Sequence, residues 1–198
     1  MRNFSVILFH DFETLDVFGP VEVMGKLNQH YRIEFYSEHG GLVKSSQNVK
    51  VQTLPITELS GLNELDALLI PGGLGTRSEV NNQEFIQVLK QLSIRAQFVL
   101  TVCTGAALLA KTGLLKNRKA TTNKMAFDWV ANLDQEVQWI RKARWVTDGK
   151  YYTSSGVSAG IDMTLGFIGD IIGMEAAGRI STGIEYIWNK DRNDDPFC

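Results

Sequence analysis

The chain is poor in the features that mark several classes of protein. It has 198 residues but only two cysteines, Cys103 and Cys198. Two cysteines are too few for a disulfide scaffold, so we expect free thiols and a cytoplasmic location. No apolar run reaches the length of about 20 residues that a membrane helix needs. The apolar stretch 4–9 is short and acidic residues follow it at once, so we expect neither a signal peptide nor a membrane partner.

The chain also lacks a large excess of one charge sign and any spacing of residues typical of a metal site. The chain has 20 basic and 22 acidic residues and a net charge of -2, without a long basic cluster, so we expect no nucleic-acid partner. The three histidines, His10, His30 and His39, show no spacing typical of a metal site. A Gly-rich segment at 71–75 lacks the Lys-Ser/Thr of a phosphate loop. We therefore predict no metal and no cofactor.

What the chain does have is an ordinary share of apolar residues, 44%, arranged as alternating strand-like and helix-like segments. No linker or repeat interrupts them, so we predict one domain over residues 1–198. The predicted strands are 4–9, 32–37, 49–54, 67–70 and 98–102, and the predicted helices are 14–27, 84–95, 105–111, 126–133, 159–172 and 175–188. This order predicts an α/β fold with a mostly parallel central sheet covered on both faces.

Two segments depart from the simple alternation. Residues 144–147 and 150–154 flank Asp148-Gly149, which predicts a β-hairpin with a type I′ turn. Aromatic side chains alternate with polar ones around it, and we interpret them as packing or dimer surface rather than a ligand cage; they are Trp139, Trp145, Tyr151 and Tyr152. The polar segment 189–198 is expected to be loose or docked across a partner.

In a parallel sheet, sites form at the carboxyl ends of the strands, and Cys103 follows the apolar strand 98–102. Thr104, Gly105 and further small residues come next and open a helix, as in a nucleophile elbow. The helix N-terminus favours the thiolate, the reactive form of cysteine. The alternative is a structural cysteine acting as a small buried hydrophobe.

The second strand end carries Gly72 and Gly73. Glycine lets the backbone approach a ligand closely, and an N–H group here could act with that of Thr104 as an oxyanion hole. A plain turn between strand and loop is the alternative.

The third strand end carries His10 and, a turn later, Asp16 among the apolar residues Leu15, Val17 and Phe18. A carboxyl group in such surroundings tends to stay protonated and could act as an acid. The alternative for Asp16 is a helix N-cap. We interpret His10 as a bystander.

Together these segments resemble the DJ-1/PfpI superfamily, and within it the isocyanide hydratase branch. The resemblance extends over nearly the whole chain, and the matching segments are 15–20, 70–73, 102–105, 113–115, 119–122, 148–149, 154–156, 159–162, 184–186 and 196–197. It implies a flavodoxin-like three-layer sandwich, a homodimer and a small-molecule substrate. It also implies that Cys103 is the nucleophile, Thr104 its hydrogen-bonding neighbour, Asp16 the acid, and Gly73 and Thr104 the oxyanion donors. In that branch a thiolate attacks an isocyanide, and water releases an N-formamide through a thioimidate.

The chain departs from its relatives at two places. PfpI-type peptidases carry histidine directly after the cysteine, where this chain has Thr104, so we do not expect a peptidase. Hydratases of the branch tend to carry His-Trp where this chain has Asn123-Lys124, in a loop near the substrate entrance, so the substrate stays open.

Three functions therefore stand as hypotheses. The first is a cysteine-dependent hydratase acting on a small isocyanide-like electrophile. The second is a ligand or oxidation sensor that uses Cys103, because the same core occurs in AraC-type regulators and an accessible low-pKa cysteine oxidises readily. The third is a glyoxalase or deglycase, which usually relies on Glu and His near the cysteine, whereas Asp16 and Thr104 stand here.

Overall fold

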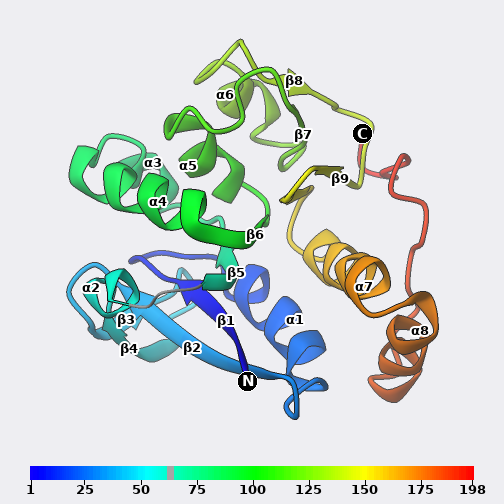
Figure 1. Ribbon diagram of the computed structural model, residues 1–198. Coiled ribbons are helices and arrows are strands. Elements are labelled where there is room, and N and C mark those ends of the chain that lie inside the picture. Colours follow the sequence, from blue (N-terminus) through cyan, green and yellow to red (C-terminus); the bar gives the residue numbers. More distant parts are fainter. Residues whose placement is uncertain (62–64) are drawn as a thin grey trace.

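The structure, a computed structural model that describes residues 1–61 and 65–198, is built on one eight-stranded sheet (Figure 1). The strands lie in the order β3-β4-β2-β1-β5-β6-β10-β9. Their bounds are β1 Arg2–Ile7, β2 Tyr31–Ser37, β3 Gly41–Lys44, β4 Lys50–Pro55, β5 Leu65–Ile70, β6 Ala96–Thr101, β9 Trp145–Asp148 and β10 Tyr151–Ser154. The inner six strands are parallel, whereas β3 and β9 pair antiparallel at the two edges. The short strands β7 (Lys119–Ala120) and β8 (Gln138–Trp139) pair separately.

Helices cover both faces of this sheet, as the predicted α/β class requires. Helices α1 and α7 pack together on one side, and α4 and α5 lie on the other (Figure 1). The helix bounds are α1 Thr14–Gly25, α2 Thr57–Ser60, α3 Thr76–Glu79, α4 Gln83–Arg95, α5 Gly105–Lys111, α6 Phe127–Ala131, α7 Ala159–Ile171 and α8 Met174–Gly183. The central strands β1, β5 and β6 are buried on both faces, which explains their continuous apolar runs.

The predicted β-hairpin is present, but its turn is not the predicted one. Tyr151 pairs with Asp148, so the two turn residues are Gly149 and Lys150 rather than Asp148 and Gly149. Gly149 has a φ of 60°, whereas neither Asp148 nor Lys150 has a positive φ. A positive φ at the first turn residue alone is typical of a type II′ turn, so the prediction of type I′ was wrong. Trp145 and Tyr152 are buried, in line with the packing interpretation.

The last helix ends earlier than predicted, at Gly183 rather than near Trp188. Glu185 has a φ of 52°, the left-handed conformation that closes many helices. The Tyr186 N–H donates to the Ser181 carbonyl at 2.9 Å and the Glu185 N–H donates to the Thr182 carbonyl at 3.1 Å, which is a Schellman motif. The apolar period of the sequence continues past this turn, so it misled the prediction.

The C-terminal segment 189–198 is docked on its own chain, and the expectation of a loose tail was wrong. Asp195 is only 3% exposed, and its N–H donates to the Lys142 carbonyl at 2.8 Å. Its carboxylate lies 3.6 Å from Arg144 and 3.7 Å from Lys124. Arg144 also forms a buried pair with Asp162 at 2.7 Å. These charges come from four separate parts of the chain, and we call them the tail network.

Arg144→Leu is expected to destabilise the protein by about 3–5 kcal/mol, because it leaves the Asp162 carboxylate buried without its partner. The free energy of unfolding in urea measures this loss. Arg179→Leu is the matched control, since Arg179 forms an exposed pair with Glu175 and its loss should cost under about 1 kcal/mol. Equal losses in the two variants would show that the tail network contributes little.

Candidate active site

Cys103 lies on a sharp turn between β6 and α5, as the elbow pattern predicted. Its φ is 56°, a left-handed conformation that costs energy for any residue with a β-carbon. The Val102 N–H donates to the Ile70 carbonyl at 3.1 Å, which holds the ends of β5 and β6 together. A β-carbon on Gly105 would clash with that same carbonyl oxygen, so only glycine can start α5 here. The turn therefore fixes the thiol at the carboxyl edge of the sheet.

The thiol of Cys103 is mostly enclosed, with 7% of the residue exposed. Burial and the charge of Asp16 raise its pKa above the ordinary value, whereas the N–H groups of Thr104 and Val157 and the Thr104 hydroxyl act in the opposite direction. Burial and the carboxyl thus oppose ionisation of the sulfur, whereas the N–H groups at the start of α5 and in the loop 155–158 favour it, as the sequence predicted for the helix terminus.

Asp16 is completely buried in the first turn of α1, beside Cys103. Burial raises its pKa well above the usual range, although hydrogen bonds from the Gly72 N–H and from the Cys103 thiol lower it. Its Oδ2 accepts the Gly72 N–H at 2.9 Å, whereas no N–H or O–H group of the described residues satisfies Oδ1. The N-cap residue of α1 is Glu13, so Asp16 is not a helix cap.

Asp16 and Cys103 together behave as one coupled acid. The negative charge of Asp16 raises the pKa of the Cys103 thiol, and both groups are buried. Ionisation of both groups at once is therefore disfavoured. A single proton shared between sulfur and carboxyl can be taken up by either as a reaction proceeds.

The two glycines after β5, Gly72 and Gly73, make contacts that differ from the predicted role of oxyanion donors. The Gly72 N–H donates to Asp16, and the Gly73 N–H donates to Thr104 Oγ1 at 3.1 Å. Both amides thus have acceptors inside the protein, which argues against their assignment as oxyanion donors. Gly72 positions the acid, and Gly73, with a φ of 127°, positions the Thr104 hydroxyl.

Thr76 is a buried neighbour that the sequence analysis missed. Its Oγ1 lies 2.7 Å from the Gly73 carbonyl oxygen and 3.1 Å from Thr104 Oγ1. It therefore fixes the Thr104 hydroxyl beside the thiol. A threonine following Gly75 carries no recognisable motif, so no signal in one sequence could have revealed it.

Val157 is a second missed residue that contacts the sulfur. Its N–H acts on the Cys103 thiol. Its φ is 26°, which is strained for a β-branched residue. The Cys103 N–H donates to the Ser155 carbonyl at 3.0 Å, and the Thr122 hydroxyl donates to the Cys103 carbonyl at 2.8 Å. The contacts of Ser155 and Val157 bind the loop 155–158 to the elbow, and the Thr122 hydroxyl ties the segment at 122 to the same residue.

A pocket of about 390 Å³ lies beside this loop. We call it the elbow pocket, and its lining residues are Asn123, Lys124, Met125, Ser155, Gly156, Val157, Ser158 and Phe197. Two of them also contact Cys103, Ser155 through the Cys103 N–H and Val157 through the thiol, so the pocket and the elbow share the loop 155–158, although Cys103 itself does not line the pocket. The Asn123-Lys124 loop lines it, where the family resemblance placed the substrate entrance.

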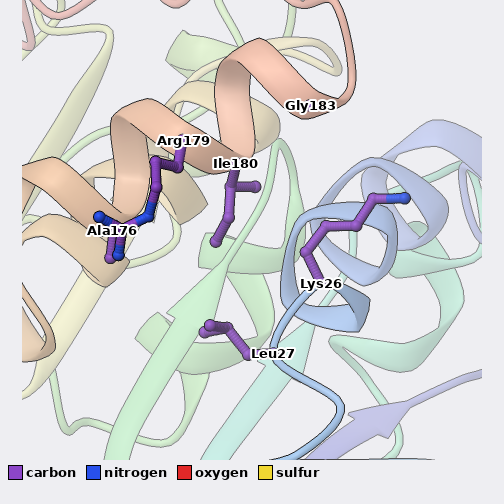
Figure 2. A pocket seen from close by; sticks show the side chains of 6 residues that line it. All are labelled: Lys26, Leu27, Ala176, Arg179, Ile180 and Gly183. Carbon is purple, nitrogen blue, oxygen red and sulfur yellow. The ribbon is translucent and has the colours of Figure 1, made fainter.

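Another pocket of about 390 Å³ lies between the end of α1 and helix α8. Figure 2 shows its lining residues, with Leu27 and Ile180 facing each other between the charged Lys26 and Arg179. Both charges are already paired, with Glu22 and Glu175 respectively. No titratable thiol or unpaired carboxyl lines this pocket, so it offers no comparable chemistry.

Over the residues that the structure describes, no three His, Cys, Asp or Glu side chains gather as a metal site would require. Within the same residues, no helix combines the length and apolarity needed to cross a bilayer. His10 lies away from the thiol, in a third pocket, where its Nδ1 accepts the Lys44 N–H at 3.4 Å.

Gly72→Ala is expected to destabilise the protein by about 1–3 kcal/mol through overpacking. A β-carbon at this position would lie 2.6 Å from Thr104 N, 2.7 Å from Thr104 Oγ1 and 2.8 Å from Asp16 Oδ2. Gly25→Ala is the control, because a β-carbon there meets no atom within 4 Å. Urea unfolding measures both, and a Gly72→Ala variant as stable as Gly25→Ala would refute this account of the packing.

Asp16→Asn is expected to lower the pKa of the Cys103 thiol. The carboxylate charge raises that pKa in the wild type, so a neutral amide removes part of the shift while burial remains. The pH profile of Cys103 alkylation by iodoacetamide should therefore move to lower pH. Asp11→Asn, which changes a nearby exposed carboxyl, should leave the profile in place. A shift to higher pH in Asp16→Asn would contradict the assigned coupling.

Comparison with known proteins identifies relatives of this chain. The DJ-1/PfpI family matches residues 2–169. An isonitrile hydratase of Pseudomonas putida is 28% identical over 180 residues, which are 91% of this chain and 76% of that protein. The deglycase PfpI of Pyrococcus furiosus is 26% identical over 145 residues, which are 73% of this chain and 84% of that protein.

Solved structures give the same result for the fold. A THiJ/PfpI family protein from Pseudomonas syringae superimposes with a TM-score of 0.84 at 25% identity, covering 95% of this chain and 76% of that one. The architecture is thus the flavodoxin-like sandwich that the resemblance implied. With the match extending over most of its length, the chain belongs to the DJ-1/PfpI family.

Proposed function

We propose that this protein is a cysteine-dependent hydratase that adds water to a small isocyanide and releases an N-substituted formamide. One observation carries the proposal: the Cys103 thiol lies on a strained elbow beside the buried Asp16 carboxyl, against a loop that lines the elbow pocket. The similarity to an isonitrile hydratase supports the choice of substrate class.

The first step is attack of sulfur on the terminal carbon of the isocyanide. Asp16 takes the S–H proton as the sulfur attacks, and it returns that proton to the same carbon. The product is a thioimidate, in which carbon is bonded to sulfur and hydrogen and doubly bonded to nitrogen. The raised pKa of Asp16 suits a carboxyl group that must both accept and donate a proton.

The second step is hydrolysis of the thioimidate. Asp16, again a carboxylate, takes a proton from water as the water oxygen bonds to carbon, and it passes that proton to the nitrogen. In the collapse of the tetrahedral intermediate the carbon–sulfur bond breaks, and Asp16 takes the hydroxyl proton and passes it to sulfur. The N–H groups of Thr104 and Val157 face the sulfur and stabilise the negative charge that develops there. The sum is isocyanide plus water giving formamide.

The oxidation-sensor hypothesis receives less support. Thiolate is the form that peroxide oxidises, and burial together with Asp16 raises the pKa of Cys103. The deglycase hypothesis has a relative in its favour, but Asp16 and Thr104 occupy the positions where Glu and His are expected beside the cysteine. Homodimerisation and a cytoplasmic location, both expected from the sequence, belong to the proposal.

The wild-type protein is expected to convert cyclohexyl isocyanide to N-cyclohexylformamide, detected by mass spectrometry. Cys103→Ala should abolish turnover, and Asp16→Asn should lower kcat at least about 100-fold, the usual contribution of a general acid–base group. Cys198→Ala is the matched control, because Cys198 is the exposed second cysteine and should be dispensable.

The covalent thioimidate intermediate gives an independent check. Wild-type protein quenched in acid during turnover should gain the mass of one isocyanide on the peptide that contains Cys103. Absence of formamide at high enzyme concentration, or equal activity of Cys103→Ala, would refute the hydratase.

A further inference from the structure

The outer rim of the elbow pocket is made by two apolar side chains from distant parts of the chain, Met125 and Phe197. Both side chains are solvent-exposed, Met125 to 99% and Phe197 to 73%. Exposed apolar side chains of this size at a pocket rim lose water-accessible area when an apolar ligand covers them. The rim therefore offers apolar surface to a ligand that enters the elbow pocket.

Phe197 is positioned by the tail network rather than left mobile at the surface. Its N–H donates to Asp195 Oδ1 at 3.1 Å, and the Cys198 N–H donates to the Asp195 carbonyl at 3.1 Å. The same Asp195 carboxylate lies within 4 Å of Arg144 and Lys124. The buried carboxylate thus fixes the turn that carries the phenyl ring.

The charged residue of the rim is not available to a ligand. The Lys124 ammonium lies 2.7 Å from the Ala143 carbonyl oxygen, 3.1 Å from Thr121 Oγ1 and 3.7 Å from Asp195. Its side chain points into the protein and is largely buried, so its positive charge is already paired within the tail network. The remaining lining is neutral, and a neutral apolar group is the ligand that this rim suits.

We propose that Phe197 is a specificity-determining residue that selects electrophiles carrying a bulky apolar group, such as a cycloalkyl or branched alkyl group on the isocyanide nitrogen. The inference rests on the proposed function for the identity of the electrophile. The reacting carbon lies at Cys103, and the substituent extends past Val157 toward Met125 and Phe197. Asp195 is a positioning residue that acts through Phe197.

The test compares kcat/KM for cyclohexyl isocyanide with that for methyl isocyanide. In Phe197→Ala this ratio should fall about fivefold, within the range for partial loss of an apolar contact. Phe197→Leu should retain most of it. Ile187→Ala is the matched control, because Ile187 is 94% exposed, lies in the same C-terminal region and does not line the pocket. A ratio unchanged in Phe197→Ala would overturn the inference.

A binding measurement separates this inference from the hydratase proposal. N-cyclohexylformamide is titrated into Cys103→Ala and into Cys103→Ala/Phe197→Ala, with the Met125 methyl resonance as the signal. Weaker binding in the double variant supports the role of Phe197 even if the wild type makes no formamide, in which case only the hydratase fails. Equal binding in both variants, with no turnover by the wild type, overturns the inference too.

Discussion

The site depends on how closely the ends of β5 and β6 approach each other. Their backbones are joined at Ile70 and Val102, and the space between the two following loops admits no β-carbon at Gly72 or Gly105. Cys103, in the turn after β6, adopts a left-handed conformation. The Gly72 N–H lies within reach of the Asp16 carboxyl from α1. The thiol and hydroxyl of residues 103 and 104 thus meet the acid of α1 beside the glycines that follow β5.

The sequence predicted the parts of the fold whose signals are local. Buried strands have continuous apolar runs, and the helix over 84–95 has an apolar face. The predicted bounds of most strands and helices therefore lie within one or two residues of the observed ones. The edge strand β3 was missed, because a four-residue strand with one buried side chain carries no pattern. The end of α8 was misplaced, because Glu185 adopts a left-handed conformation that is uncommon for glutamate and cannot be predicted from its residue type.

The candidate site shows the same division. Cys103, Asp16 and Thr104 could be singled out because each follows a recognisable strand end, and the structure brings them together. The effects that raise the pKa of the sulfur could not be predicted, because they depend on burial and on contact with a carboxyl 87 positions away in the chain. Val157 and Thr76 act through backbone geometry and a single hydroxyl contact, which leave no trace in residue type.

The tail network also affects the order in which the protein can be completed. Asp195 contacts Arg144 and Lys124, which precede it by 51 and 71 positions. Every residue of the elbow precedes Phe197 in the chain, so the side of the elbow pocket that Phe197 forms is the last part of the site to be synthesised.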